Sequence, residues 1–311
     1  MPRSPERYDL LRTRLERFTQ ALHEMEEGGV KAVHQARVAS RRLRELLPVL
    51  QLDPDVLRKL SRRLRKVTGR LGTVRELDVL AGVLDELGKA DRHPQQALAQ
   101  VAATIDEERR RKRERLLAKG ELRELRRVGD KLEKVARTLE KQDAVPRGTE
   151  QRSWKWAIDA RVARRAATLA TAISGAGTVY LPERLHAVRI AVKKLRYALE
   201  LSTEVAQVKS SPDLRQLRRA QDILGRLHDL AVLMNRTRAA QGRVTPPDVN
   251  VWRQLDDLVA SLEDNCRRLH GRYMKDREAL LALCTPLSGR TADARGEKVE
   301  VRSQKLKVRS S

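Results

Sequence analysis

Aromatic residues are scarce in this chain of 311 residues. It contains one Phe, three Trp and four Tyr, which together make up 3% of the sequence. Proteins that bind single-stranded nucleic acid stack the bases on aromatic side chains, and helices that lie in a membrane surface insert Trp and Phe. The basic segments described below contain no Trp and no Phe. The scarcity therefore argues against both kinds of binding.

Two further absences bear on the cell compartment. Cys266 and Cys284 are the only cysteines, and no residues have metal-site spacing, so we expect no bound metal or cofactor. Few cysteines are typical of the reduced cytosol. No segment approaches the ~18 to 20 apolar residues of a membrane span, and the N-terminus lacks the apolar core of a secretion signal. We expect a cytoplasmic protein that does not bind membranes.

Positive charge, in contrast, is abundant. The chain has 66 Lys and Arg against 42 Asp and Glu, a formal net charge of +24. Such an excess destabilises a compact chain by self-repulsion unless something negative binds to it. We therefore expect a polyanionic partner. Net charge alone does not distinguish nucleic acid, polyphosphate, anionic lipid and acidic protein.

The apolar residues follow a helical period. They recur every three or four positions, as at Leu57, Leu60, Leu64, Val67 and Leu71, which predicts an all-α protein. About four helices are expected before residue 141 and about four after 151, with 142–150 as a linker. The segment 286–311 has no apolar period, so we expect a disordered basic tail. The helix breaks fall at Gly28-Gly29, Asp53-Pro54, Arg92–Pro94, Ala144–Gly148, Ser174–Pro182, Ser210–Pro212 and Val244–Pro247.

The chain also resembles itself. Residues 33–47 read VHQARVASRRLRELL and residues 185–199 read LHAVRIAVKKLRYAL, with His and the cations in register. Residues 71–80, LGTVRELDVL, match 224–233, LGRLHDLAVL, at an offset that differs by one residue. Two matches at nearly one offset predict a tandem duplication. The first helical bundle would span 5–141 and the second 151–285.

The repeated helix presents its cations on one side. His34, Arg37, Arg41 and Arg44 fall within a stripe of about 80° on a helical wheel, while the apolar residues lie opposite. Arg42 lies beside the stripe. Like charges at this spacing repel one another, and a bound anion would remove the repulsion. The second half repeats the stripe with His186, Arg189, Lys193 and Arg196, and Lys194 lies beside it.

A second basic row precedes each LG motif. It consists of Arg62, Arg65 and Lys66 in the first half, and of Arg215, Arg218 and Arg219 in the second. Two basic helices in each half would then converge on one groove. Other basic clusters, at 109–115 and at Arg267, Arg268 and Arg272, are interpreted as ordinary solvated surface.

The doubled motif resembles the CHAD domain, the conserved histidine α-helical domain, over roughly residues 5–285. The resemblance implies two helical bundles related by pseudo-twofold symmetry, with basic residues around a groove or pore. It further implies binding of inorganic polyphosphate and association with polyphosphate granules. The residues that it carries over are His34, Arg37, Arg41, Arg42, Arg44, His186, Arg189, Lys193, Lys194 and Arg196. To these candidate polyphosphate-binding residues we add the second basic rows: Arg62, Arg65, Lys66, Arg215, Arg218 and Arg219.

Two alternatives remain open at this point. Nucleic acid is the main one, because phosphate contacts also dominate affinity there. The other is a polyphosphate-processing enzyme that uses His34 or His186 as nucleophile. Phosphoryl transfer normally needs metal-holding carboxylates, which the stripes lack. CHAD domains are often fused to a triphosphate-processing β-barrel, and no strand-rich segment is visible here. We therefore expect non-catalytic binding.

Overall fold

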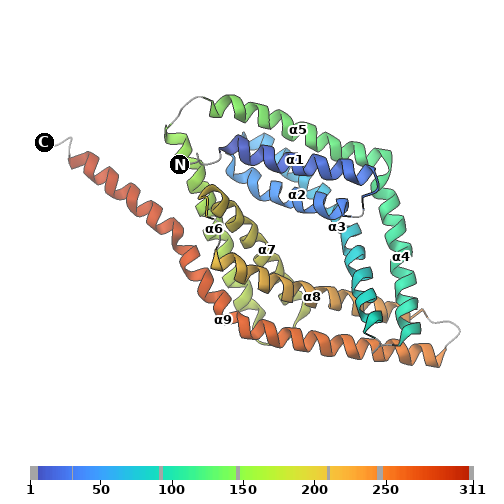
Figure 1. Ribbon diagram of the computed structural model, residues 1–311. Coiled ribbons are helices and arrows are strands. Elements are labelled where there is room, and N and C mark those ends of the chain that lie inside the picture. The colour runs from blue at the N-terminus through green and yellow to red at the C-terminus, as the bar shows by residue number, and fades with distance from the viewer. Residues whose placement is uncertain are drawn as a thin grey trace. The chain divides into compact units, whose positions relative to one another are not determined.

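The computed structural model describes residues 6–29, 31–90, 94–144, 148–208, 211–243 and 248–307, without the side chains of 148–153 and 290–307. Every regular element in these ranges is helical, which confirms the all-α prediction (Figure 1). The elements are α1 (Arg7–Glu26), α2 (Ala32–Leu46), a 3-10 turn η1 (Leu47–Val49), α3 (Pro54–Lys89), α4 (Gln95–Leu117), α5 (Lys119–Asp143), α6 (Gly148–Ala176), α7 (Pro182–Val205), α8 (Pro212–Gln241) and α9 (Val249–Lys307).

Two of the predicted breaks have clear local causes, whereas residues 91–93, 145–147, 209–210 and 244–247 of four other breaks lie outside the described residues. Between α1 and α2 the chain turns at Gly28, whose φ of +84° favours glycine, and at Gly29, where a Cβ would lie 2.8 Å from the Glu24 carbonyl oxygen. At the start of α3 the Asp53 carboxylate accepts hydrogen bonds from the backbone N–H groups of Asp55 and Val56. Both positions are therefore chemically specified turns.

One boundary was missed. The sequence predicts a single helix between Pro94 and residue 141, but the structure divides it into α4 and α5 at Ala118. That residue adopts an extended ψ of 138° and has no glycine or proline next to it to signal a break. The described part of the first half thus has five helices instead of about four.

The end of the chain also differs from expectation. We expected disorder from Pro286 onward, whereas α9 continues through Pro286 to Lys307. Proline removes one backbone hydrogen bond from a helix interior. Here Leu283 and Leu287 on either side of it are buried, and this packing holds the helix together across the proline. Beyond it, Arg, Ala, Glu and Lys are residues that favour helix.

The helices form two compact units. The larger unit contains α1 to α5, the part of α8 from Gly225 and the part of α9 up to His270. The smaller unit contains α6, α7, the part of α8 up to Leu224 and the part of α9 from Gly271. The two predicted repeats, 5–141 and 151–285, were defined from the sequence alone. Their origin by tandem duplication stays a prediction.

In the larger unit α1 packs between α2 and α5, and α3 packs against α2 and α4 (Figure 1). Leucines such as Leu11, Leu43 and Leu64 are fully buried there. The beginning of α1 is tied to the end of α5 by the ion pair of Arg7 with Asp143, 2.5 Å apart and almost completely buried. The smaller unit has its own core, in which Leu169 of α6 and Val188 of α7 are buried.

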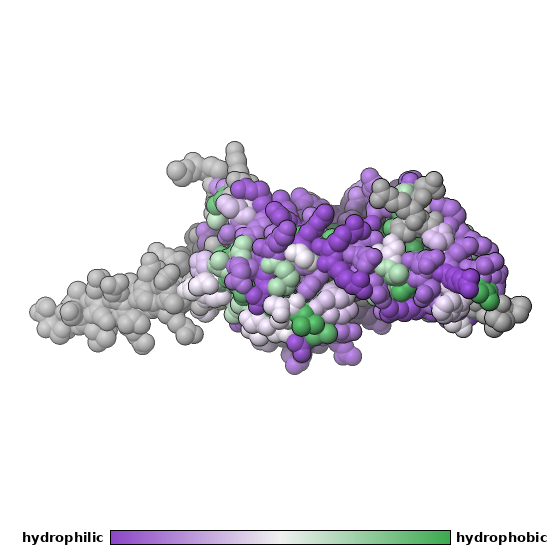
Figure 2. Space-filling model, turned by 90° about the horizontal axis from the view of Figure 1, so that it is seen from below, coloured by the Kyte–Doolittle hydropathy of each residue, from purple (hydrophilic) through white to green (hydrophobic). Residues whose placement is uncertain are grey.

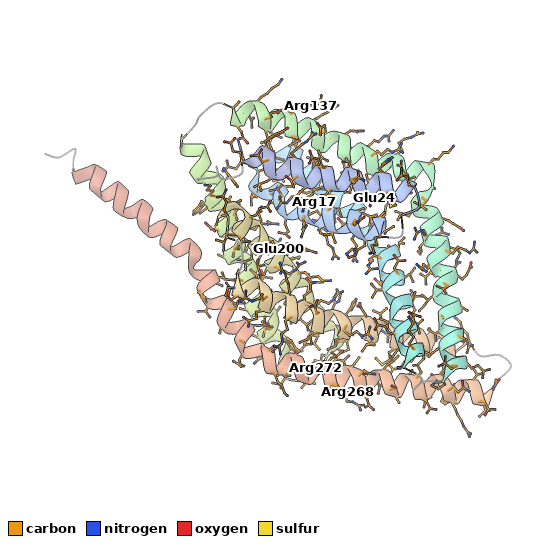
Figure 3. All side chains as sticks on the ribbon, in the orientation of Figure 1. Arg17, Glu24, Arg137, Glu200, Arg268 and Arg272 are labelled. Carbon is orange, nitrogen blue, oxygen red and sulfur yellow. The ribbon has the colours of Figure 1, made fainter. Side chains whose placement is uncertain are left out.

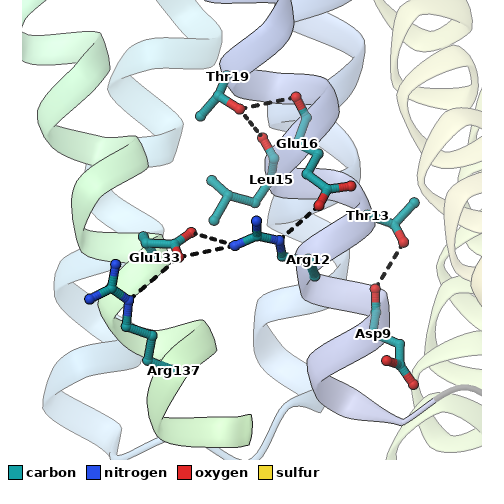
Figure 4. Close-up of polar contacts among 8 residues, drawn as sticks. All are labelled: Asp9, Arg12, Thr13, Leu15, Glu16, Thr19, Glu133 and Arg137. Atoms are coloured by element: carbon teal, nitrogen blue, oxygen red, sulfur yellow. Dashed lines mark hydrogen bonds and ion pairs between the residues drawn. The ribbon is translucent and has the colours of Figure 1, made fainter.

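The surface is predominantly hydrophilic, as the face shown in Figure 2 illustrates. Many surface cations pair with carboxylates. Arg12 of α1, for example, reaches Glu16 at 2.8 Å and Glu133 of α5 at 3.0 Å, and Arg137 shares Glu133 at 3.5 Å (Figure 4). Among the described helices, none has the length and apolar content needed to cross a membrane.

Candidate functional site

The basic stripe of α2 lies against α3 in the larger unit. A buried hydrogen bond from the Thr68 hydroxyl to the Ser40 hydroxyl, 3.1 Å long, joins the two helices. One turn along α3, a Cβ on Gly72 would lie 3.5 Å from the guanidinium of Arg37. The absence of a side chain at Gly72 therefore leaves room for Arg37, whose Nε is buried. The glycine of the first LG motif thus has a packing role, whereas a Cβ on Gly225 of the second LG motif would meet nothing within 4 Å.

His34 lies within a group of cations from both helices. Partial burial lowers the pKa of the His34 imidazole, and the charges of Arg75, Arg37 and Arg41 lower this pKa further. The Asp78 carboxylate acts weakly in the opposite direction. The positive potential at His34 therefore comes from α2 and α3 together. We call His34, Arg37, Arg41 and Arg75 the α2–α3 cluster.

Arg75 was not among the predicted residues, although the sequence held a signal for it. It stands three positions after Gly72 and therefore on the same face of α3. The neighbouring Asp78 accepts a hydrogen bond of 2.7 Å from Nε of Arg109 on α4. Arg109 had been interpreted as solvated surface. In the structure it neutralises a carboxylate beside the α2–α3 cluster.

Arg42 lies on a different side of α2, as the helical wheel indicates. It lines a pocket of about 360 Å³ between α1 and α2, together with Arg14 and Arg17 of α1. Arg17 is labelled in Figure 3. His34 lines this pocket as well, so it borders both the pocket and the α2–α3 cluster. Arg44 is half-buried on α2.

The predicted row on α3 lies on the surface, on one face of the helix. Arg62 and Arg65 are exposed. Lys66 is exposed as well. A hydrogen bond from Arg127 lowers the pKa of Glu124 on α5, and the charge of Lys66 lowers this pKa further. Lys66 is thus near a carboxylate.

The basic stripe of α7 lies in the smaller unit, where His186, Arg189, Lys193 and Lys194 are half-buried. The Nε of Arg189 is buried, as is that of Arg37 at the matching position of the repeat. Arg196 contacts several neighbouring side chains. Its guanidinium donates to Gln221 at 2.8 Å and to Glu200 at 2.5 Å, and it stacks 4.6 Å from the centre of the Tyr197 ring. Arg196 therefore carries a structural role as well.

The row on α8 borders a groove in the same unit. Arg215, Arg218 and Arg219 line it together with Arg272 and Lys275 of α9. Arg218 also approaches Glu200 of α7 at 4.0 Å, and Arg219 pairs with Asp276 of α9 at 2.9 Å. Among the described residues, no group of three or more His, Cys, Asp or Glu side chains is placed to hold a metal ion.

The chain is similar to known proteins in sequence pattern and in fold. A family model of the CHAD domain matches residues 10–238, and the chain belongs to the CHAD domain family. The CHAD domain from the plant Ricinus communis aligns with a TM-score of 0.61 and 21% identity, covering 88% of this chain and 90% of that one. PptA from Streptomyces chartreusis aligns with a TM-score of 0.59 and 18% identity, covering 88% and 98%. At these identities the likeness shows the fold. No curated protein matches the chain in sequence.

Proposed function

We propose that this chain binds inorganic polyphosphate through the α2–α3 cluster and the basic residues of α7 and α8, and that it does not cleave the polymer. The CHAD domain family is associated with polyphosphate binding. Binding of this kind would also serve to bring the protein to polyphosphate granules.

The observation that carries the proposal is the environment of His34. Partial desolvation lowers the pKa of the His34 imidazole, and three arginines from two helices lower it further, so the cluster concentrates positive potential around this surface residue. An anion placed there relieves the repulsion between these groups and forms charge-assisted hydrogen bonds. Polyphosphate has a negative charge at each phosphate and no bases, so it needs no aromatic stacking platform.

Polyphosphate titrations of paired variants test the proposal. We expect Arg37→Ala/Arg41→Ala and Arg189→Ala/Lys193→Ala each to weaken binding by about tenfold or more, since each removes two charge-assisted contacts. The slope of log affinity against log salt should become shallower by about 1.5 for two lost contacts.

Lys134→Ala/Arg137→Ala is the matched control. It also removes two cations, but from the exposed face of α5. Equal losses in this control and in the stripe variants would show that only net charge matters, and would contradict the proposed site.

Two further measurements separate polyphosphate binding from its alternatives. Duplex DNA at equal phosphate concentration should not displace labelled polyphosphate. Displacement would favour a nucleic-acid-binding protein. Incubation with polyphosphate and Mg²⁺ should leave the chain length unchanged, and release of orthophosphate would identify an enzyme.

A further inference from the structure

A strongly cationic groove lies between α8 and α9 in the smaller unit. It has a volume of about 670 Å³ and is lined by five cations, one carboxylate and one apolar side chain: Arg215, Arg218, Arg219, Arg272, Lys275, Asp222 and Ile223. The α8 residues follow one face of the helix over about two turns, roughly 10 Å. Arg272, labelled in Figure 3, and Lys275 lie one turn apart on α9.

The carboxylates of α9 that are nearest in sequence to these two cations pair with other arginines. Asp276, four residues after Arg272, pairs with Arg219 at 2.9 Å. Glu278, three residues after Lys275, pairs with Arg277 at 2.7 Å. Elsewhere a surface arginine commonly has its own acid one turn away, as Arg110 has Glu107 and Glu114, both at 2.9 Å. The groove thus keeps an excess of positive charge that local ion pairs do not balance.

The pair of Arg219 with Asp276 also has a geometric consequence. It joins α8 to α9 at the groove, and Asp276 is mostly buried. The cations of the two helices are therefore held beside one another in the empty protein, which lowers the conformational cost of binding an extended anion.

We propose that α9 completes a polyphosphate subsite in the smaller unit, with Arg272 and Lys275 binding the same stretch of phosphates as Arg215, Arg218 and Arg219. The inference rests on the proposed function and extends it to a helix beyond residue 238, where the match to the CHAD family model ends. A phosphate chain lying along the groove contacts cations on both walls. A solvated helix face would offer cations on one side only.

The test compares Arg272→Ala/Lys275→Ala with Lys134→Ala/Arg137→Ala in the full chain. Each variant loses one Arg and one Lys three residues apart on an exposed helix face, so the change in net charge is the same. We expect the α9 variant to bind long-chain polyphosphate about tenfold more weakly than the control, with a salt slope shallower by about 1.5. Arg272→Lys, which keeps the charge, should retain most of the affinity. Thermal unfolding of each variant checks that the fold is kept.

The outcomes separate the two proposals. If the α9 variant and the control bind equally well while Arg37→Ala/Arg41→Ala is impaired, the α9 subsite is wrong and the proposed function stands. If the wild type fails to bind polyphosphate, both are wrong. A loss of affinity for duplex DNA, with polyphosphate binding unchanged, would make the groove a nucleic-acid site and would also overturn the inference.

Discussion

At the scale of single residues, His34 connects the charge of the site to pH. In the empty protein, burial and the charges of Arg75, Arg37 and Arg41 keep the pKa of the imidazole below its ordinary value. A phosphate chain beside the ring favours the protonated form and raises this pKa. The proposed binding would therefore be coupled to proton uptake, and we expect affinity to increase as the pH falls through the pKa of the bound state.

We predict that polyphosphate affinity rises between pH 8 and pH 6 in the wild type and rises less in His34→Ala. Isothermal titration calorimetry in buffers of different ionisation enthalpy would measure the proton uptake directly. His23→Ala is a suitable control, because His23 lies on α1 and pairs with Glu27. If affinity changes identically with pH in wild type and His34→Ala, His34 does not contribute to the binding site.

The two cysteines differ from His34, because their burial makes the thiol groups unreactive. Cys266 and Cys284 are free thiols and are buried, and burial raises the pKa of the Cys284 thiol to about 11. The thiolate is the reactive form of cysteine. We predict that native protein at pH 8 resists alkylation by iodoacetamide at Cys284, and that both thiols react after denaturation. Rapid modification of Cys284 in the native protein, measured by mass spectrometry, would show that its burial is transient.

At the scale of secondary-structure elements, the helices are held together by contacts of very different strength. The pair of Arg7 with Asp143 joins α1 to α5 where both side chains are about nine-tenths buried, and Asp143 also accepts a hydrogen bond from the Tyr8 backbone. The pair of Arg12 with Glu133 joins the same helices where both side chains are partly exposed. Removal of one partner from a buried pair leaves an uncompensated charge, whereas solvent screens an exposed pair.

We therefore predict that Asp143→Ala lowers the free energy of unfolding by about 3 kcal/mol, and that Glu133→Ala has a much smaller effect. Urea denaturation followed by circular dichroism measures both changes. Similar values for the two variants would mean that the Arg7 guanidinium finds another partner or reaches water.

The helix boundaries show which features of secondary structure can be predicted from a single sequence. The helical period, the glycine turn at Gly28 and the Asp53 cap are local features, and the helices they predict are present. The boundary at Ala118 and the continuation of α9 past Pro286 are not visible locally. At Ala118 a single extended residue divides two strongly helical sequences, and at Pro286 buried leucines on both sides outweigh one lost hydrogen bond.

At the scale of the whole molecule, the membership of the CHAD family and the all-α fold were both predictable. The doubled pattern of His, Arg and Lys carries the family resemblance, and amphipathic periodicity requires helices whose apolar sides are buried together. The net charge of +24 favours an anionic partner, because like charges repel whatever the fold, and this partner stays a prediction.

The amino-acid sequence by itself determined which residues lie on one face of each helix, since that depends only on the angle between successive residues. Tertiary structure decided which faces meet. The packing of α3 on α2 places Arg75 beside His34. The packing of α4 on α3 gives Asp78 its partner Arg109. The pairing of α8 with α9 brings Arg272 and Lys275 to the groove. These contacts join residues far apart in the chain, and helical periodicity contains no information about the partner of a helix.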